Sequence, residues 1–281
     1  MFEEKSTTLY YRVSDKGVEA ITGVVIGESR WSLFVNGLEV VTFMATSRDM
    51  HHLGLGFLAS ENLIAGLQDI ASIRVNQAPD RAYWFIPALG VNETRHMAIC
   101  EDGVGSVEVR LTHTDFRLPQ HRVLTSGCGG GVTFDDLAKE QTPLDSTRTI
   151  RSAQIFAMMH EMNARATLYR ECRGVHTSAL SDGEQLLAIA EDVGRHNTLD
   201  KIRGDCLMRG VETRDRILIT TGRVSSEMIT KASKMRVPIV ISRTSPTYLA
   251  IQLAHAWNIV LVGYAHAGQM QVYNGIERIV M

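Results

Sequence analysis

The chain has 281 residues, of which 44% are hydrophobic and 21% charged, so it can bury a sizeable core and is neither disordered nor fibrous. Its 29 basic and 31 acidic residues give a net charge of −2, which excludes the global basic excess that drives nonspecific nucleic-acid binding. The four cysteines form no Cys-x-x-Cys pair, which excludes a zinc ribbon and a secreted disulfide framework.

The N-terminal residues 1–17 mix charged and polar side chains and lack the apolar core and cleavage site of a signal peptide. No later stretch reaches the roughly 18 uninterrupted apolar residues that span a bilayer. We therefore expect a cytoplasmic protein without a membrane contact. In that compartment thiols stay reduced, and a lone cysteine can be reactive.

Strand signals dominate the first half of the chain, and we predict a β-rich N-terminal portion over residues 1–135. Residues 30–35 and 38–44 carry alternating apolar side chains around Asn36-Gly37, which predicts a tight hairpin. The other elements expected here are a helix within 47–64 and strands over 70–75, 82–86 and 106–112.

Helices and strands alternate in the second half, which we take as an α/β domain over residues 136–281. Methionines at helical spacing predict a helix around 155–162, and a further helix is expected over 195–210 with Gly210 as its stop. The remaining elements are strands over 175–180, 186–191, 217–221, 237–241 and 259–262, and helices over 225–235 and 246–257. Ser245 is the expected N-cap of the last helix, with Pro246 at its first position. Such alternation predicts a largely parallel sheet covered by helices.

The turns after the parallel strands are the expected ligand site, because open α/β sheets bind ligands outside the carboxyl ends of their strands. Arg223 and Arg243 lie in two of these turns beside hydroxyl side chains, which suits phosphate oxygens. The third of these expected strand-to-helix turns runs over residues 263–269. None of the three is a Walker loop or a Gly-x-Gly-x-x-Gly fingerprint. The pattern is equally consistent with Ser225 and Ser245 as plain helix caps beside solvated arginines.

Cys128 is the most unusual residue in the sequence. It stands in the run Ser126-Gly-Cys-Gly-Gly-Gly-Val132, in which four of seven residues are glycine, so the run must be a loop. Thin side-chain cover and an anion-stabilising nest of loop amides favour the thiolate, and hence a nucleophile or sulfur carrier. The alternative is a structural cysteine buried at a tight turn. Cys206, on the apolar face of a predicted helix, is expected in the core.

The segment 191–201 reads Glu-Asp-Val-Gly-Arg-His-Asn-Thr-Leu-Asp-Lys and carries seven ionisable or amide side chains in eleven residues. A solvated helix start capped by Asp192 explains part of this composition. It does not explain Arg195 and His196 beside Gly194. We therefore expect the edge of a site, in which Arg195 holds an anion and His196 transfers or shares a proton.

A zinc-dependent deaminase site is not expected. Such a site needs His-x-Glu and a later Pro-Cys-x-x-Cys, because three ligands hold the metal and the glutamate moves protons. Here His176 is followed by Thr177 and Ser178, and the sequence contains no Pro-Cys-x-x-Cys. We therefore expect no metal site of this class.

Several short motifs are shared with a known family. They are Val35-Asn-Gly37, Leu55-Gly-Phe-Leu58, the cysteine loop, Gly174-Val-His176, Glu191 to Asn197 with Asp200-Lys201, Gly222-Arg-Val-Ser225 with Glu227, Leu261-Val-Gly263 and Val272-Tyr-Asn-Gly275. Together they resemble the FdhD family of formate dehydrogenase accessory proteins, from about residue 30 to the end of the chain. The run Glu-Asp-Val-Gly-Arg-His-Asn is the most specific of them.

This resemblance implies a sulfurtransferase that takes persulfide sulfur from a cysteine desulfurase. The sulfur goes to the molybdenum bis(molybdopterin guanine dinucleotide) cofactor of formate dehydrogenase. The resemblance also implies a homodimer and a cytidine-deaminase-like three-layer α/β domain without zinc, joined to a smaller β-rich N-terminal portion. Cys128 would carry the persulfide, and Arg195, His196, Arg223 and Arg243 would help to hold the guanine nucleotide. The loop expected to meet the nucleotide consists of Tyr264, Ala265, His266, Ala267, Gly268 and Gln269.

One departure from the family pattern concerns a second loop cysteine. In many members of the family this loop resembles a Cys-x-x-Cys motif, whereas in this chain glycines occupy positions 129–131 after Cys128. A resolving cysteine is then absent unless Cys100 or Cys172 folds close, although transfer through one thiol remains chemically complete. The alternative function is a chaperone that binds the molybdenum cofactor without covalent sulfur transfer. A deaminase-like hydrolase is a third option.

Overall fold

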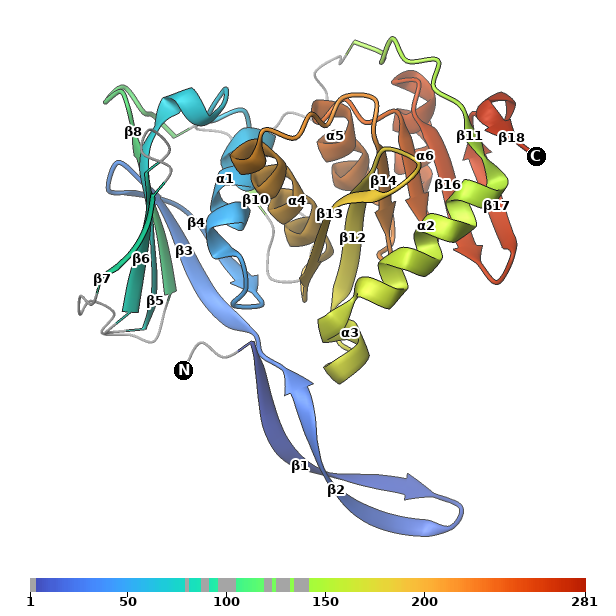
Figure 1. The fold of residues 1–281 in the computed structure, drawn as a ribbon, viewed down its shortest axis with the longest axis horizontal. Coiled ribbons are helices and arrows are strands. Elements are labelled where there is room, and N and C mark those ends of the chain that lie inside the picture. Colours follow the sequence, from blue (N-terminus) through green and yellow to red (C-terminus); the bar gives the residue numbers. More distant parts are fainter. Residues whose placement is uncertain are drawn as a thin grey trace.

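The computed structural model describes residues 4–78, 81–86, 91–95, 105–118, 123–124, 132–133 and 142–281. Within these ranges the chain has a mixed α/β fold with two six-stranded sheets. Figure 1 shows the two sheets side by side with helices between them, and a two-stranded arm that projects away from both. Cys128 and Cys100 lie outside the described residues.

The first sheet comes from the N-terminal half and has the strand order β4-β3-β8-β5-β6-β7. Its elements, with the helix that packs on it, are β3 (Ser29–Val35), β4 (Leu38–Ala45), α1 (Met50–Ser60), β5 (Ile70–Ala78), β6 (Arg81–Ile86), β7 (Val91–Arg95) and β8 (Gly105–Leu111). The turn between β3 and β4 has Asn36 at φ 50° and Gly37 at φ 85°. Positive φ at both residues suits the twist of a two-residue hairpin. The hairpin predicted there is confirmed.

The second sheet comes from the C-terminal half and has the strand order β13-β12-β14-β15-β16-β17. Its strands are β12 (His176–Ser181), β13 (Leu186–Asp192), β14 (Ile217–Thr220), β15 (Ile239–Ser242), β16 (Val260–His266) and β17 (Gln269–Asn274). Only β14, β15 and β16 are parallel to one another. The expectation of a largely parallel sheet is therefore wrong for the outer strands. Short turns join β12 to β13 and β16 to β17, and such turns link only antiparallel strands.

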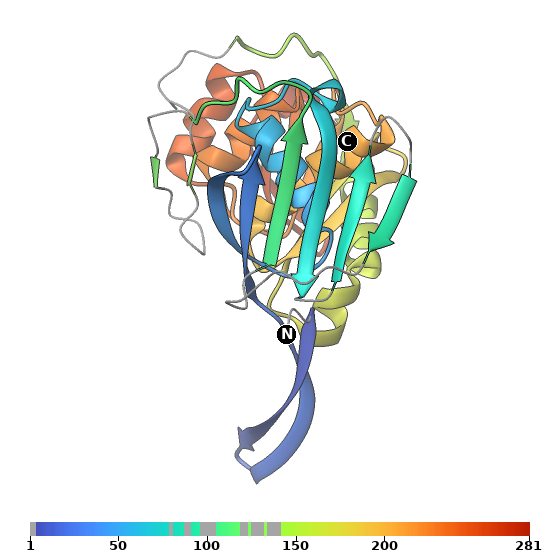
Figure 2. The ribbon, with the colours of Figure 1, turned by 90° about the vertical axis from the view of Figure 1, so that its left-hand side faces the viewer.

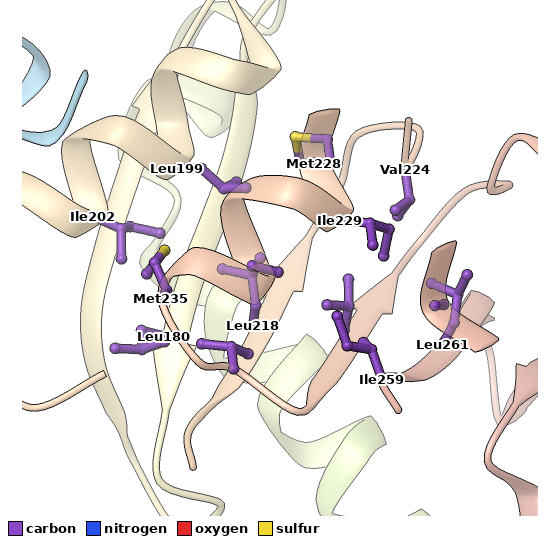
Figure 3. Packing of buried hydrophobic residues seen from close by; sticks show 14 of the residues in the cluster. Leu180, Leu199, Ile202, Leu218, Val224, Met228, Ile229, Met235, Ile259 and Leu261 are labelled. Atoms are coloured by element: carbon purple, nitrogen blue, oxygen red, sulfur yellow. The ribbon is translucent and has the colours of Figure 1, made fainter. Parts of the chain in front are cut away.

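Helices cover both faces of the second sheet, which makes it the middle of three layers. The helices are α4 (Arg195–Arg209), α5 (Ser226–Lys234) and α6 (Tyr248–Ala256) on one face, and α2 (Ser152–Arg165), which continues into α3 (Thr167–Cys172), on the other. Because side chains alternate along a strand, Leu218 of β14 packs against the first group while Ile217 and Ile219 pack against α2. Figure 3 shows Leu218 among the side chains of α4 and α5.

The last helix begins later than the sequence predicts. Its N-cap is Thr247, whose hydroxyl accepts a hydrogen bond from the backbone N–H of Ala250 at 3.3 Å, so the prediction of Ser245 as N-cap is wrong. The reason is a parallel bridge between Val224 and Pro246, which keeps the chain extended as far as Pro246. By contrast, Gly210 ends α4 in the left-handed conformation at φ 65°, as predicted.

The two halves of the chain touch where α1 crosses α4. A Cβ atom at Gly56 would lie 1.7 Å from the backbone oxygen of Asp200, and one at Gly204 would lie 2.0 Å from the backbone oxygen of His52. The helix backbones are therefore in direct contact, and only glycine fits at these two positions.

The arm consists of β1 (Lys5–Ser14) and β2 (Gly17–Ile26) and was not predicted from the sequence. These strands pair only with each other among the described strands. Figure 2 shows the arm extending well beyond the body of the molecule. The short remaining elements are η1 (Leu67–Asp69), β9 (Val123–Leu124), β10 (Val132–Thr133), β11 (Ile150–Arg151), η2 (Ile276–Arg278) and β18 (Ile279–Val280). None of the helices in the described ranges has the length and hydropathy needed to span a membrane.

Candidate functional site

The carboxyl ends of β14, β15 and β16 form one continuous edge. The backbone N–H of Arg243 donates to Thr220 at 3.0 Å, and that of Tyr264 donates to Thr244 at 3.1 Å. The N–H of Val224 donates to the loop after β15 at 3.1 Å. The structure therefore brings together the three segments in which the sequence places Arg223, Arg243 and Tyr264. The side chains of all three residues are exposed on this edge.

Arg195, the first residue of α4, lies beside this edge and is almost completely buried, with 6% of its surface exposed. Its Nε and Nη2 atoms have no hydrogen-bond partner among the described residues. A Cβ atom at Gly222 would lie 3.0 Å from Cβ of Arg195, so glycine is what lets the arginine pass the end of β14. A buried cation with unsatisfied donors is unfavourable unless an anion pairs with it. The position is thus suited to binding an oxyanion.

Two histidines flank Arg195. The Nδ1 atom of His176 would lie 3.3 Å from a Cβ atom at Gly222, on the same side as the arginine. Burial, and then the charge of Arg195, lowers the pKa of His176. Both effects favour the neutral imidazole of His176 beside the positive charge of Arg195. No role at the site was predicted for His176 from the sequence, although this residue ends the shared motif Gly174-Val-His176.

His196 is hydrogen-bonded on its Nε2 atom, which lies 3.1 Å from Oγ of Ser225 and 3.3 Å from Oε2 of Glu227. Burial, followed by the charge of Arg195, lowers the pKa of His196 to about 3. The ring is neutral at pH 7, so its contact with Glu227 is a hydrogen bond between a neutral donor and a carboxylate. His196 can share a proton with Ser225 or Glu227 but does not supply a positive charge.

The two acidic residues at the start of the 191–201 segment are occupied by protein groups. Glu191 accepts hydrogen bonds from the backbone N–H groups of Leu168 and Tyr169, each at 2.9 Å, and so holds the start of α3. Asp192 is fully buried and pairs with Lys201 at 2.6 Å. These contacts are structural, and they fix the loop that leads into Arg195.

Further contacts tie this segment to the N-terminal half. Asp192 accepts from the backbone N–H of Thr46 at 3.2 Å, and Lys201 donates to the backbone oxygen of the same residue at 3.1 Å. Asp200 pairs with Lys231 of α5 at 2.6 Å and accepts from Ser60 of α1 at 2.8 Å. Much of the polar character of the segment therefore braces α4 against both sheets. The sequence motif alone did not separate these braces from ligand-binding groups.

Residues 264–269 form a hairpin, which corrects the expectation of a loop leading into a helix. Tyr264, Ala265 and His266 end β16, and Gln269 begins β17. The turn consists of Ala267 at φ 50° and Gly268 at φ 75°, the two positive values of a two-residue hairpin. The Ala265 side chain is fully buried and faces the core. The exposed residues of the segment line a shallow depression, which is formed by Tyr264, His266, Gln269, Met270 and Gln271.

The cysteines that the structure describes are not activated thiols. Cys206 is 1% exposed in the core, as predicted, and burial raises its pKa to about 12. Cys172 is partly buried with Sγ 3.2 Å from the backbone oxygen of Leu168, and burial together with Glu171 raises its pKa. In the described part of the chain, no cluster of three or more His, Cys, Asp or Glu side chains is arranged to hold a metal ion.

Comparisons with known proteins agree with one another. The model of the FdhD/NarQ family matches residues 26–280. A protein of Halalkalibacterium halodurans named sulfur carrier protein FdhD is 32% identical over 279 residues, covering 98% of this chain and 95% of that protein. The Bacillus subtilis protein of the same name is 32% identical over 275 residues, covering 96% and 95%.

The fold also matches a solved structure. A crystal structure from Desulfotalea psychrophila, described as a formate dehydrogenase accessory protein, superposes with a TM-score of 0.73 at 23% identity. The match covers 99% of this chain and 100% of that one. At this identity the structure supports the fold, and the family model together with the curated relatives supports the membership. The chain therefore belongs to the FdhD/NarQ family.

Proposed function

We propose that this protein carries sulfur as a persulfide on Cys128 and delivers it to a molybdenum cofactor with guanine nucleotides, for use by formate dehydrogenase. The sulfur would come from a cysteine desulfurase. Family membership and the names of the relatives support a role as sulfur carrier. The likeness of the three-layer domain to cytidine deaminases is part of the same proposal.

The proposed cofactor binding is supported mainly by the buried guanidinium of Arg195, in which two nitrogen atoms lack a hydrogen-bond partner among the described residues. A bis-guanine-dinucleotide cofactor carries pyrophosphate groups, and a guanidinium is well matched to phosphate oxygens. Arg223 and Arg243 lie on the adjacent edge and can meet further phosphate oxygens. Tyr264 and its exposed neighbours supply a surface on which a guanine base can stack.

The sulfur chemistry uses one thiol. The Cys128 thiolate attacks the outer sulfur of the desulfurase persulfide, the S–S bond breaks, and the desulfurase cysteine leaves as a thiolate. Cys128 then holds the outer sulfur as Cys–S–SH. Release of this sulfur as sulfide needs two electrons, which a reducing thiol supplies by forming a disulfide with Cys128. Because positions 129–131 are glycine, the loop itself offers no such thiol.

The persulfide is tested by incubating the protein with a cysteine desulfurase and cysteine, followed by peptide mass spectrometry. The expected result is the mass of one added sulfur on the peptide that contains Cys128, and none on Cys128→Ala. Cys172→Ala serves as the matched control and should load like the unchanged protein. Sulfur found on another cysteine, or on none, contradicts the assignment of the carrier residue.

A cofactor-binding chaperone without covalent transfer is the second candidate, because the loop lacks a second cysteine. The two functions differ in the behaviour of Cys128→Ala. A sulfur carrier loses formate dehydrogenase activation in this variant while it still binds guanine nucleotide. A chaperone retains activation.

A further inference from the structure

Ser225 stands at the N-cap position of α5 but does not cap the helix. Its backbone is extended, with φ −92° and ψ 171°, yet its hydroxyl accepts no hydrogen bond from the first turn of α5. The neighbouring helix α6 differs, because the hydroxyl of Thr247 accepts from the backbone N–H of Ala250. A serine at an N-cap normally accepts such a bond, since the first N–H groups of a helix have no partner within it. The Ser225 hydroxyl is therefore available for another contact.

The hydroxyl of Ser225 is turned toward His196, the second residue of α4. Its Oγ atom lies 3.1 Å from Nε2 of the ring, and Nε2 also lies 3.3 Å from Oε2 of Glu227. The neutral ring carries one proton, and the nitrogen that faces a carboxylate is the one that bears it. Nε2 is then a donor, and Oγ of Ser225 can only accept from it. The hydroxyl hydrogen of Ser225 is left to donate in another direction.

Two helix amino termini meet at this contact. α4 begins at Arg195, after Gly194, which has no side chain to cap it, and α5 begins directly after Ser225. Neither end is capped by the side chain of its N-cap residue. Each presents backbone N–H groups together with the positive end of the helix dipole. Two such ends side by side form a favourable surrounding for an anion.

The buried side chain of Arg195 independently indicates an anionic ligand at this junction. Its Cβ and Cδ atoms would lie 3.0 Å and 3.5 Å from a Cβ atom at Gly222, so the side chain runs along the turn that leads from β14 to α5. Its Nε and Nη2 atoms have no hydrogen-bond partner among the described residues. A guanidinium buried in this way is unfavourable without an anion beside it. These unused donors and the Ser225 hydroxyl belong to the same turn.

We propose that Ser225 is a ligand of a phosphate group at the junction of α4 and α5, and that His196 positions it. The Ser225 hydroxyl donates to one phosphate oxygen, Arg195 donates to others, and the open end of α5 supplies backbone N–H groups. His196 does not touch the phosphate. It holds Ser225 away from the end of its own helix, and its Nε2 atom engages the Glu227 carboxylate, which would otherwise repel an anion. This role rests on the proposed function, in which the cofactor carries phosphate groups.

The test is calorimetric titration of the full chain with two probes, GDP and pyrophosphate. Ser225→Ala should weaken the binding of both probes about 10-fold, the usual effect of removing one hydrogen bond to a charged group. Thr247→Ala is the matched control, because it removes a hydroxyl that caps the neighbouring helix. The control should lower the free energy of unfolding and leave both affinities unchanged.

A double-mutant cycle separates positioning by His196 from direct contact with the phosphate. His196→Ala should weaken the binding of both probes about as much as Ser225→Ala does. The double variant should bind no more weakly than either single variant, because the histidine acts only through the serine. His196→Gln should bind within about 3-fold of the unchanged protein, since its amide N–H can replace the Nε2–H donor.

The two probes distinguish failure of this proposal from failure of the proposed function. A Ser225→Ala variant that binds both probes as tightly as the unchanged protein overturns Ser225 as a phosphate ligand. Losses that add in the double variant overturn the positioning role of His196. Binding of pyrophosphate that depends on Ser225, without binding of GDP, supports the phosphate site and contradicts the guanine-nucleotide part of the proposed function. Binding of neither probe overturns both.

Discussion

Replacing Lys201 with methionine removes the cation of a buried ion pair and should destabilise the whole protein. Lys201 is 1% exposed and Asp192 is 0% exposed, and their charged atoms are 2.6 Å apart. The variant leaves a carboxylate in the interior with only hydrogen-bond donors around it, two of which are the backbone N–H groups of Gly194 and Thr46. Breaking one side of a buried pair in this way costs about 3–5 kcal/mol.

The assay is urea unfolding at pH 7, with the free energy of unfolding taken from the midpoint and slope. Arg209→Met provides the matched control, because Arg209 and Asp205 form an ion pair of the same 2.6 Å length on the solvated side of the same helix. The control should lose less than about 1 kcal/mol. Adding Asp192→Asn to Lys201→Met should recover part of the loss, since no buried charge remains. A loss for Lys201→Met no larger than the control refutes the reasoning.

Three further predictions concern other buried groups. Burial lowers the pKa of His196 to about 3 and that of His51 to about 4. The unfolded chain therefore binds protons that the native state excludes, and the free energy of unfolding should fall below pH 6.5 by about 1.4 kcal/mol per pH unit for each histidine. His196→Gln should show a shallower fall in a pH series of urea melts, and an unchanged slope counts against this. Iodoacetamide should leave Cys206 unmodified in the native protein, as measured by peptide mass spectrometry. Rapid alkylation of Cys206 contradicts the burial argument. Gly56→Ala should lose more than about 3 kcal/mol, because its Cβ atom would overlap the backbone oxygen of Asp200, and a near-neutral result refutes the close crossing of α1 and α4.

Local signals in the sequence were sufficient where one residue type dictates the backbone. Asn36-Gly37 and Gly210 adopt the positive φ values that the turn and the helix end require. The same logic could have found the hairpin at Ala267-Gly268, since two residues ending in glycine between two apolar strands are a hairpin signal. The error came from extending the alternation of strands and helices one element too far.

Contacts distant in the sequence could not be predicted in the same way. Asp192 meets Thr46 across 146 residues, and Asp200 meets Ser60 across 140. The sequence identified the 191–201 segment as important, but only the fold shows that Asp192 and Asp200 brace the structure while Arg195 keeps donors without a partner among the described residues. The arm was not predicted from the sequence. Its alternating side chains belong to two strands that pair with no other described strand, so they mark no face of a larger sheet.

The proposed binding of the cofactor depends most on Arg195 as an anion-binding residue at the end of the second sheet. Calorimetric titration with GDP and with guanosine separates binding of the phosphates from binding of the base. Hydrogen bonds to a charged group contribute about 1.5–3 kcal/mol, so Arg195→Gln should weaken GDP binding by roughly 10- to 100-fold. The same variant should bind guanosine as the unchanged protein does.

Arg214→Gln is the control, because Arg214 pairs with Asp145 on the surface and should leave both affinities unchanged. Only Arg195→Gln is expected to lose affinity, and only for GDP, the ligand with phosphates. GDP binding that is equally strong in Arg195→Gln and the unchanged protein would contradict the proposed site.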